Sequence, residues 1–391
     1  MAFFRNTAKV LRRELGRIVK NPIYPILMVI LPVVAFAFFS EIFSVGVPRE
    51  FKVAVLDMDN TDLSRTLVSM MDATPSVDIA YGITDMIEGE EMVKRGEVVG
   101  VVYIPENFEK DILSNAQTTV ATYISGLNIT ANGLVHKDIQ TVVTTFAGGI
   151  QLQKLMKQGM TERQAKANIT PIYFEKHQLF NPYTNYGYYL LPSFLPMMLM
   201  VFTLMLATFA IGTELKNRTA AEWMAAADNG IWAAIIGKML PYTTMMFILS
   251  LFMNVVMHKW VGVPMAGSGG VMTIAGFLFI LAYQSIAILF VSVFANMRLA
   301  LSIGGGYSVL AFSFSGMTFP LVAMDGWVQV ASNIFPFTFY TQIFIDQVMR
   351  GAPTYQSYIN LGVLAVFAIV PMLCLPRLKK IALNEKYWGR T

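Results

Sequence analysis

Long apolar runs separated by shorter polar segments dominate the chain. Six runs are each close to the ~20 residues that an α-helix needs to cross the hydrocarbon core of a bilayer. They cover residues 22–45, 190–211, 235–257, 271–294, 299–322 and 358–375. The pattern predicts an α-helical membrane protein with six transmembrane helices.

The segment before the first run has two different faces. Its apolar side chains recur at helical spacing, at Phe4, Ala8, Leu11, Leu15 and Ile18. Six Lys and Arg side chains occupy the other face, which is typical of a helix lying among lipid headgroups. The alternative is the basic start of a signal peptide, but the following run, 22–45, is too long for that. We therefore expect residues 1–21 to form a cytoplasmic elbow helix and the run to remain as the first span.

Residues 46–188 have a mixed pattern. β-branched runs at 52–56, 77–81, 98–104 and 119–124 alternate with helical patterns, which predicts a small inserted α/β domain. From 128 to 166 the pattern is helical and polar, which favours a long arm rather than part of a core. No run in this segment could cross a bilayer, so the whole domain is expected on one side of the membrane.

The basic residues near the span ends indicate the orientation. They gather in the N-terminal segment, in the loop 212–240, near residue 298 and in the tail 377–391. The opposite short loops contain only Lys259 and Arg350. By the positive-inside rule both termini and the loop 212–240 are cytoplasmic, and the α/β domain is extracytoplasmic.

The loop 212–240 has an amphipathic pattern of its own. Apolar positions recur every four residues, at Leu215, Thr219 (by its methyl), Trp223, Ala227 and Ile231. The sequence from Thr219 to Glu222 fits a capping box, and Asn229-Gly230 is a helix stop. Such a helix either rests on the lipid surface or is the surface through which an outside machine moves the neighbouring spans.

The segment 316–351 is apolar and aromatic but is broken by Pro320 and Pro336. Irregular backbone at membrane depth is tolerated only when it is buried in protein or lines a cavity. We predict short re-entrant helices here. The alternative is an aromatic belt at the membrane interface.

Composition excludes several classes of protein. Hydrophobic residues make up 55% of the 391 residues and charged residues 14%, too apolar a balance for a soluble protein. The single cysteine, Cys374, excludes an intrachain disulfide and a Cys-based metal site. His136 and His177 have no companions at metal-ligand spacing, and the basic residues form no nucleic-acid patch. We expect no nucleic acid, metal or cofactor to be bound by this chain.

Two motifs mimic catalytic sites. Asp57-Met58-Asp59-Asn60-Thr61 after an apolar strand matches the D-x-D-x-T of aspartyl phosphotransferases. The favoured alternative is a strand ending in an Asx turn, with Thr61 or Asp62 at the N-cap of the next helix. Gly237-Lys238 lacks the first glycine and the final Ser or Thr of a P-loop. The sequence therefore predicts no catalytic residue.

The predicted order of segments is one span, a large outer α/β domain and five clustered spans with an amphipathic cytoplasmic loop. In this order of segments the chain resembles the membrane subunit of an ABC-2 type exporter, with a type V exporter-like architecture. The segment from Glu214 to Trp223 resembles the family's E-x-x-x-G-T-x-E loop, although Arg218 replaces the glycine and the last Glu is displaced by one. The segment from Ser315 to Gly351 resembles the family's S-G-x-x-F-P…W…P…G re-entrant segment. Residues 55–65 resemble the opening of its outer domain.

The resemblance implies a permease in a dimer with a second copy or a paralogue, driven by cytoplasmic ABC ATPase subunits that bind ATP and Mg²⁺. It leaves open a periplasmic adaptor, and it implies a location in the bacterial inner membrane. The coupling residues it implies are Glu214, Thr219, Glu222 and Trp223.

We further hypothesise that the fifth and second spans face each other across the dimer axis. An outer apolar gate would then form from Gly306, Phe319, Phe335 and Phe337. A gate of this kind suits a lipid-like or drug-like substrate. The alternative for the phenylalanines is that they face lipid.

Two other classes of function compete with the exporter. One is a membrane-anchored sensor or cell-envelope binding protein that acts through its outer domain. The other is a proton-driven transporter, which the scarcity of carboxylates in the apolar runs disfavours.

Overall fold

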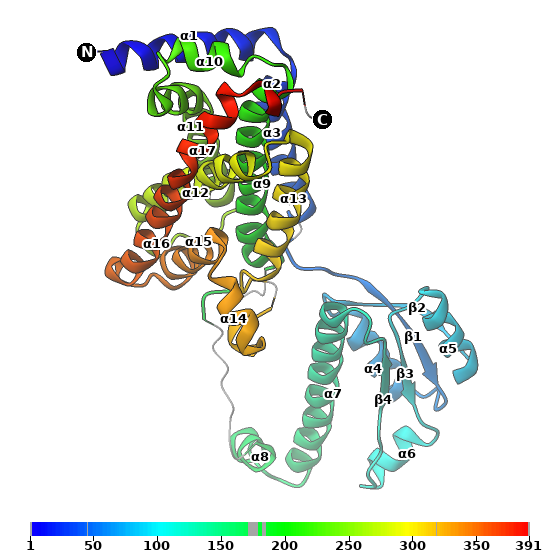
Figure 1. Ribbon diagram of the computed structural model, residues 1–391. Helices are drawn as coiled ribbons and strands as arrows, with labels where there is room; N and C mark the ends of the chain where they lie inside the picture. The colour runs from blue at the N-terminus through cyan, green and yellow to red at the C-terminus, as the bar shows by residue number, and fades with distance from the viewer. Residues whose placement is uncertain (1, 45, 171–178, 182–184, 318, 390–391) are drawn as a thin grey trace. The chain divides into compact units, whose positions relative to one another are not determined.

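The computed structural model describes the chain except for residues 1, 45, 171–178, 182–184, 318 and 390–391. His177, considered above as a metal ligand, lies outside the described residues. The chain divides into a helical unit, Met1–Gly46 with Leu179–Thr391, and an α/β unit, Val47–Gln178 (Figure 1). In the chain, the α/β unit follows the helix α3 that ends at Ile42.

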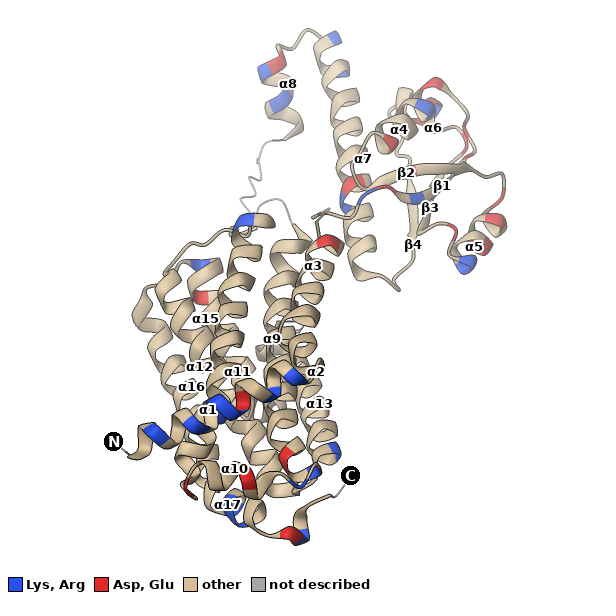
Figure 2. Cartoon of the chain, turned by 90° about the horizontal axis from the view of Figure 1, so that it is seen from above, with Lys and Arg blue, Asp and Glu red and all other residues tan. Residues whose placement is uncertain are grey.

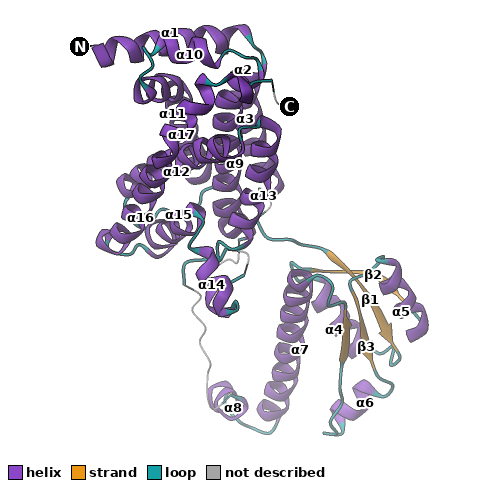
Figure 3. Ribbon diagram, in the orientation of Figure 1, coloured by secondary structure: helices purple, strands orange, loops and turns teal. Residues whose placement is uncertain are grey.

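The helical unit has no strand among its described residues (Figure 3). Its helices, in chain order, are α1 (Ala2–Lys20), α2 (Ile23–Pro25), η1 (Ile26–Ile30), α3 (Leu31–Ile42), α9 (Tyr186–Lys216), α10 (Ala220–Ala226), α11 (Ile231–Val255), η2 (Val256–Trp260), α12 (Gly269–Phe294), α13 (Met297–Ser313), η3 (Leu321–Ala323), α14 (Gly326–Ser332), α15 (Pro336–Phe344), η4 (Ile345–Arg350), η5 (Thr354–Ser357), α16 (Tyr358–Ile369), η6 (Val370–Cys374), α17 (Leu375–Leu383) and η7 (Glu385–Tyr387).

Five helical stretches within the described part of the chain are long and apolar enough to cross a membrane. They are Ile23–Ile42, Tyr186–Lys216, Ile231–Trp260, Gly269–Phe294 and Thr354–Leu383. The predicted span 299–322 is not among them, because α13 has 17 residues, a length of about 25 Å. The chain turns after Ser313, and Gly316 has a φ of +84°, which hydropathy alone does not reveal. The prediction of six spans is therefore not confirmed.

Helix α12 lies at the centre of the helical unit, against α9, α13, α15 and α16. Buried Phe279 and Tyr283 on α12 contact aromatic side chains of α13 and α15. Lys, Arg, Asp and Glu gather near the two ends of the unit and along α1, while the middle of the bundle is largely free of them (Figure 2). This distribution is the one expected for helices that cross an apolar medium.

The segment 316–351 forms short helices, as its prolines predict. Helix α15 begins at Pro336 and is buried against α12 and α16, whereas α14 is mostly exposed. The short helices are confirmed, and α15 belongs to the core of the bundle rather than to an aromatic belt.

The α/β unit is built on a four-stranded sheet. The strands are β1 (Phe51–Asp57), β2 (Val77–Gly82), β3 (Gly100–Ile104) and β4 (Ala121–Ile124), in the order β2-β1-β3-β4. β1 runs parallel to β2 and β3, and β4 is antiparallel to β3. The helices are α4 (Asp62–Asp72), α5 (Met86–Arg95), α6 (Phe108–Leu113), α7 (Ile129–Lys157) and α8 (Glu162–Ile169).

Helix α7 corrects the prediction of a polar arm. Ala131, Val135, Ile139 and Val142 form one buried stripe, and the last three belong to the core beneath the sheet. The stripe is narrow, and the polar residues of the other faces conceal it in the sequence.

The D-x-D-x-T segment forms the turn between β1 and α4. Asp57 accepts the backbone N–H groups of Asp59 and Asn60 and the Ser64 hydroxyl. Thr61 is the N-cap of α4 in a capping box with Ser64. Asp59 accepts from the Thr61 hydroxyl and from the Glu109 N–H of α6, so both carboxylates have the partners expected of the structural alternative.

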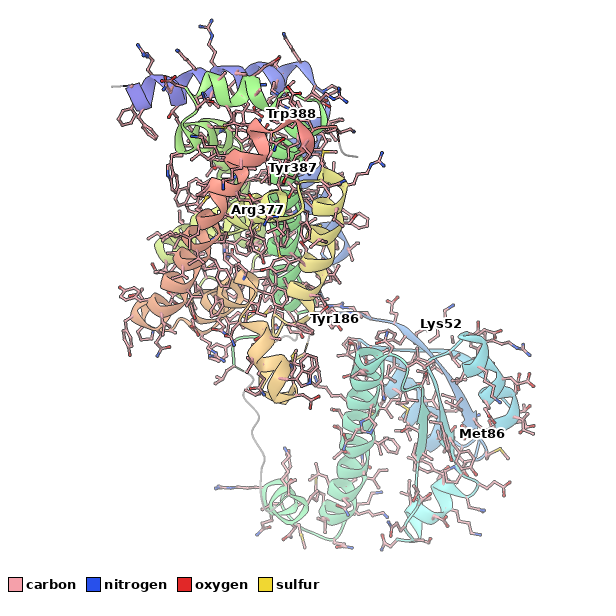
Figure 4. The ribbon with its side chains drawn as sticks, viewed as in Figure 1. Lys52, Met86, Tyr186, Arg377, Tyr387 and Trp388 are labelled. Carbon is pink, nitrogen blue, oxygen red and sulfur yellow. The ribbon has the colours of Figure 1, made fainter. Side chains whose placement is uncertain are left out.

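Both described chain ends and α10 lie at one end of the helical unit. α10 contacts both α1 and α17, and the sticks of Tyr387 and Trp388 lie at the same end (Figure 4). At the opposite end, the Tyr186 N–H donates to the Gly46 carbonyl, so the connections to the α/β unit leave side by side. This agrees with the prediction that the termini and the loop 212–240 share one side.

Candidate functional site: a buried ion cluster beneath helix α10

Helix α10 connects the end of α9 to the start of α11. Arg218 before it and Asp228 and Asn229 after it have positive φ values, so the chain turns sharply on both sides. One face of α10 is buried, through Ala220, Trp223 and Met224. The short helix is therefore fixed against the bundle by its inner face.

Glu214, near the end of α9, is the centre of a cluster of charges. Its side chain is fully buried and accepts from Arg13 on α1 at 2.6 and 3.1 Å. Arg17 of α1 and Lys238 of α11 also donate to it, the latter at 2.8 Å. One carboxylate thus joins three helices that are distant in the sequence.

Glu14 on α1 is the second buried carboxylate. It accepts from Lys238 Nζ at 2.6 Å, from Arg17 at 3.2 Å and from the Tyr242 hydroxyl. Lys238 is itself fully buried and lies between Glu14 and Glu214. Arg17 also donates to Thr213 at 3.0 Å. We call Arg13, Glu14, Arg17, Glu214 and Lys238 the ion cluster.

Helix α10 is bound directly to the ion cluster. The Thr219 hydroxyl donates to Glu214, and Lys238 Nζ lies 5.3 Å from the centre of the Trp223 ring, in a cation–π contact. The Trp223 indole N–H donates to the Ala234 carbonyl of α11 at 3.1 Å. At the rim, Arg13 reaches Glu222 at 3.7 Å.

The electrostatics keep the α1 arginines charged. Burial lowers the pKa of Arg13, but the hydrogen bond and the charge of Glu214 outweigh it, so that the pKa is raised above its ordinary value. For Arg17, burial is again the largest influence, and the charges of Glu214 and Glu14 raise its pKa overall. Both side chains therefore stay protonated and bound to the carboxylates.

Helix α1 approaches α11 closely because of Gly237. A Cβ added at Gly237 would lie 2.5 Å from the Thr7 carbonyl oxygen and 2.8 Å from Val10 Cβ. The glycine of the false P-loop thus has a packing role. It allows Lys238, the next residue, to reach Glu14 across the helix contact.

The arrangement links four helices through paired charges. Within the described part of the chain, no group of three or more His, Cys, Asp or Glu side chains could hold a metal ion. The charged groups of the ion cluster are paired with one another. What the cluster does is hold α1, α9, α10 and α11 together.

Comparison with known proteins decides the family. Residues 24–375 match a family described as ABC-2 family transporter protein, which is most of the chain. No curated protein matches the chain. The chain belongs to the ABC-2 transporter family. This ABC-2 protein is therefore a multi-pass membrane protein and a transport component.

The predicted coupling residues of the ABC-2 protein do not share one surface. Glu214 and Trp223 are fully buried, Thr219 is half-buried, and the Glu222 side chain is 73% exposed. Of these four, Glu222 has the largely exposed carboxylate, whereas Glu214 and Trp223 are inside the protein.

The capping box predicted at Thr219 is wrong. Thr219 is the N-cap of α10, but its hydroxyl donates to Glu214 instead of receiving the N3 backbone N–H. Glu222 turns towards Arg13. The buried carboxylate of Glu214 competes successfully for the hydroxyl, since hydrogen bonds to charged groups are the stronger ones.

The single helical stripe predicted from Leu215 to Ile231 is also wrong. Leu215 belongs to α9 and Ile231 to α11, and α10 between them has seven residues. The burial was predicted correctly for Leu215, Trp223 and Ala227.

The residues predicted to form a gate are also separated. Phe335 is 5% exposed and Phe337 1%, and they pack on Tyr307 and Phe279, respectively, while Phe319 is 52% exposed. Two of the three rings therefore belong to the core of one chain, where they are packed by the helices around α12.

Helix α13 packs on α9 within the chain, and the meeting of the fifth and second spans across a dimer axis stays a prediction. Cβ atoms at Gly304 and Gly305 would lie 3.4 and 3.8 Å from Leu204 and Met205 of α9. Gly306 faces away, with nothing within 4 Å of its Cβ position. The glycines thus serve an intrachain contact, and only Gly306 is free to meet another molecule.

Sequence reasoning missed Glu14, Lys238 and the partners of Glu214. Glu14 is the single acidic residue of α1, and Lys238 is a lone charge within α11. A charge inside an apolar helix needs a partner, which is the signal that could have found Lys238.

Proposed function

We propose that this ABC-2 protein is the permease subunit of an ATP-driven exporter. A separate cytoplasmic ABC ATPase binds ATP and Mg²⁺ and docks on α10. A second permease copy or a paralogue completes the transporter. Both termini lie in the cytoplasm of a bacterial cell, and the α/β unit is on the outer side of the inner membrane.

The observation that carries this proposal is the ion cluster. α10 is joined by Glu214, Thr219, Trp223 and Lys238 to the ends of two spans and to α1. Breaking one partner of a buried ion pair costs several kcal/mol, about 3–5, so these elements resist separation. A force applied to α10 is therefore passed to α9 and α11 rather than absorbed by a flexible loop.

The outer face of α10 is available for docking. Glu222 and Ala225 are exposed on the helix, and Asp228 and Asn229 are exposed just after it. This face is polar and carries acidic groups, in contrast to the buried face with Trp223. We infer that Glu222 contacts the ATPase, while Glu214 and Trp223 transmit the movement.

The scarcity of charged side chains in the middle of the bundle supports an amphipathic substrate. This substrate is lipid-like or drug-like and is taken from the cytoplasm or the inner leaflet. Charged side chains of the helical unit gather near its ends and along α1, so its middle offers little to an ion (Figure 2). Membership of a transporter family also favours transport over the alternative of a membrane-anchored sensor.

A photo-cross-linker tests the docking of an ATPase. The reactive amino acid is placed at Ala225, exposed on α10, or at Lys259, exposed at the far end of α11. Membranes of cells that produce the full chain are then irradiated with a radioactive azido-ATP analogue present.

We expect a nucleotide-labelled adduct from position 225 and none from position 259. The absence of an adduct at 225, or equal adducts from both positions, would show that α10 is not the docking surface.

A further inference from the structure

The α/β unit contains a hollow that the transport function does not explain. Its volume is about 690 Å³, within the range of pockets that hold small ligands. It lies between α6, the segment 115–120 that leads into β4, the second half of α7 and the end of α8. We propose that it is a binding site for an amphipathic organic anion, with an apolar body and one acidic group.

The walls are suited to an apolar body. Phe108 of α6 and Phe146 of α7 stack with their ring centres 6.4 Å apart, and Ile112, Val120 and Val143 also line the hollow. These side chains lie where the second half of α7 leaves the core of the unit. A ligand would cover apolar surface that the sheet itself does not cover.

Lys154 of α7 supplies a cation at the same place. Its ammonium group donates to the Ile112 carbonyl and, at 2.8 Å, to Asn115 Oδ1. Both acceptors are neutral, and no carboxylate of the described residues forms an ion pair with it. An ammonium has three donors, so one N–H and the whole positive charge remain for an acidic group of a ligand.

Gly148 keeps the hollow open. It lines the hollow from the middle of α7, and a Cβ there would meet nothing within 4 Å. Glycine inside a helix costs roughly 1 kcal/mol relative to alanine, so space is gained here at the expense of helix stability. The next residue, Gly149, also meets nothing within 4 Å but does not line the hollow.

Two matched probes test the site in the full chain, reconstituted alone in phosphatidylcholine nanodiscs. 1-Anilinonaphthalene-8-sulfonate is an amphipathic anion, and N-phenyl-1-naphthylamine is the same molecule without the sulfonate. Each probe is titrated into the nanodiscs while its fluorescence is measured, and the fluorescence measured with empty discs is subtracted. The test needs no ATPase, so its outcome is independent of the proposed export function.

We expect saturable binding of the anion, one per chain, to the wild type and to Gly149→Leu. Gly148→Leu should weaken both probes about tenfold or more, because its side chain fills the hollow. Lys154→Gln should weaken the anion about tenfold and leave the neutral probe unchanged, because a charged hydrogen bond is lost. Lys154→Arg should keep the affinity for the anion.

Three results would overturn the proposal. The first is no saturable binding to the wild type. The second is equal binding to Gly148→Leu and Gly149→Leu, which would place the probe elsewhere. The third is a Lys154→Gln variant that binds the anion normally, or that loses both probes equally, since Lys154 would then only shape the loop 112–115.

Discussion

At the scale of single residues, the buried charges of the ion cluster are the least expected feature of an apolar protein. A buried ion pair is weak evidence for stability, because removing two charges from water costs about as much as their attraction returns. Glu14, Glu214 and Lys238 are fully buried none the less, and each has at least two partners. Their role is to determine which helices pack together and at which residues they do so.

Glu214→Gln tests this interdependence. It leaves Arg13, Arg17 and Lys238 opposite Glu14 alone, so we expect the free energy of unfolding to fall by about 3–5 kcal/mol. The measurement is thermal or denaturant unfolding of the purified chain in detergent. Glu222→Gln removes an exposed pair and should cost less than about 1 kcal/mol.

Adding Lys238→Met to Glu214→Gln should restore part of the lost free energy of unfolding, because it removes one buried cation that has lost its Glu214 carboxylate. Equal effects of Glu214→Gln and Glu222→Gln would show that the buried cluster has no special importance.

At the scale of elements, α1 is bound to the protein by a face that its amphipathic pattern does not indicate. Asn6, Val10 and Glu14 are buried against the bundle, whereas Phe4 is 78% exposed and Leu15 is exposed as well. The exposed apolar face remains for lipid, as predicted for an elbow helix. The structure attaches the helix to α11, and its attachment to the membrane stays a prediction.

Gly237→Ala tests the attachment to α11. The added methyl would meet the Thr7 carbonyl oxygen, so α1 must shift, and we expect a loss of about 1–3 kcal/mol in the unfolding free energy. The shift should also loosen α1 from the bundle, so that trypsin cleaves its backbone faster at the basic residues. Gly16→Ala on α1 meets nothing within 4 Å and should be neutral or slightly stabilising.

A Gly237→Ala chain as stable and as protease-resistant as the Gly16→Ala chain would contradict the packing described here.

Much of the element pattern could be predicted from the sequence. The β-branched runs located the four strands within two or three residues, and the apolar runs located the long helices, because local sequence determines both. The predictions failed where a contact with another part of the chain determines the local structure. α13 ends early at a turn, the narrow stripe of α7 meets the sheet, and Thr219 donates to Glu214.

The candidate site shows the same limit. Glu214 and Trp223 could be selected from the loop, but the α1 partners of Glu214, Arg13 and Arg17, are about 200 residues away in the sequence. Nothing in local spacing pairs residues at such separations. The one local sign of a buried ion pair is a lone charge in an apolar helix, and Lys238 of α11 is such a charge.

At the scale of the whole molecule, one end of the helical unit brings together elements from both ends of the chain and from the loop 212–240. α1, α10 and α17 meet there, and the Gly389 N–H donates to the Leu215 carbonyl at the end of α9. The opposite end holds the two connections to the α/β unit. Each unit has its own core.

Single cysteines in a Cys374→Ser background test which face meets a second copy. Gly306 and Phe319 are exposed, so cysteines there should cross-link between copies if this face lies at the dimer axis. A cysteine at Phe337 should neither label nor cross-link, because that position is buried within one chain. Labelling of 306 and 319 by lipid-phase reagents alone would instead place this face in the bilayer.

We infer that the ion cluster makes α10 and α1 move as one body. The most direct test is a distance measured between these two helices. Spin labels at Lys9 and Ala225, both exposed, report on α1 and α10 in the Cys374→Ser chain. A second pair at Ile274 and Ile359, on the neighbouring helices α12 and α16, reports whether the fold is intact.

We expect one narrow distance distribution between Lys9 and Ala225, which becomes broad in Glu214→Gln while the Ile274–Ile359 distribution stays narrow. A Lys9–Ala225 distribution that is broad from the outset, or equally narrow with and without the Glu214 carboxylate, would contradict this inference.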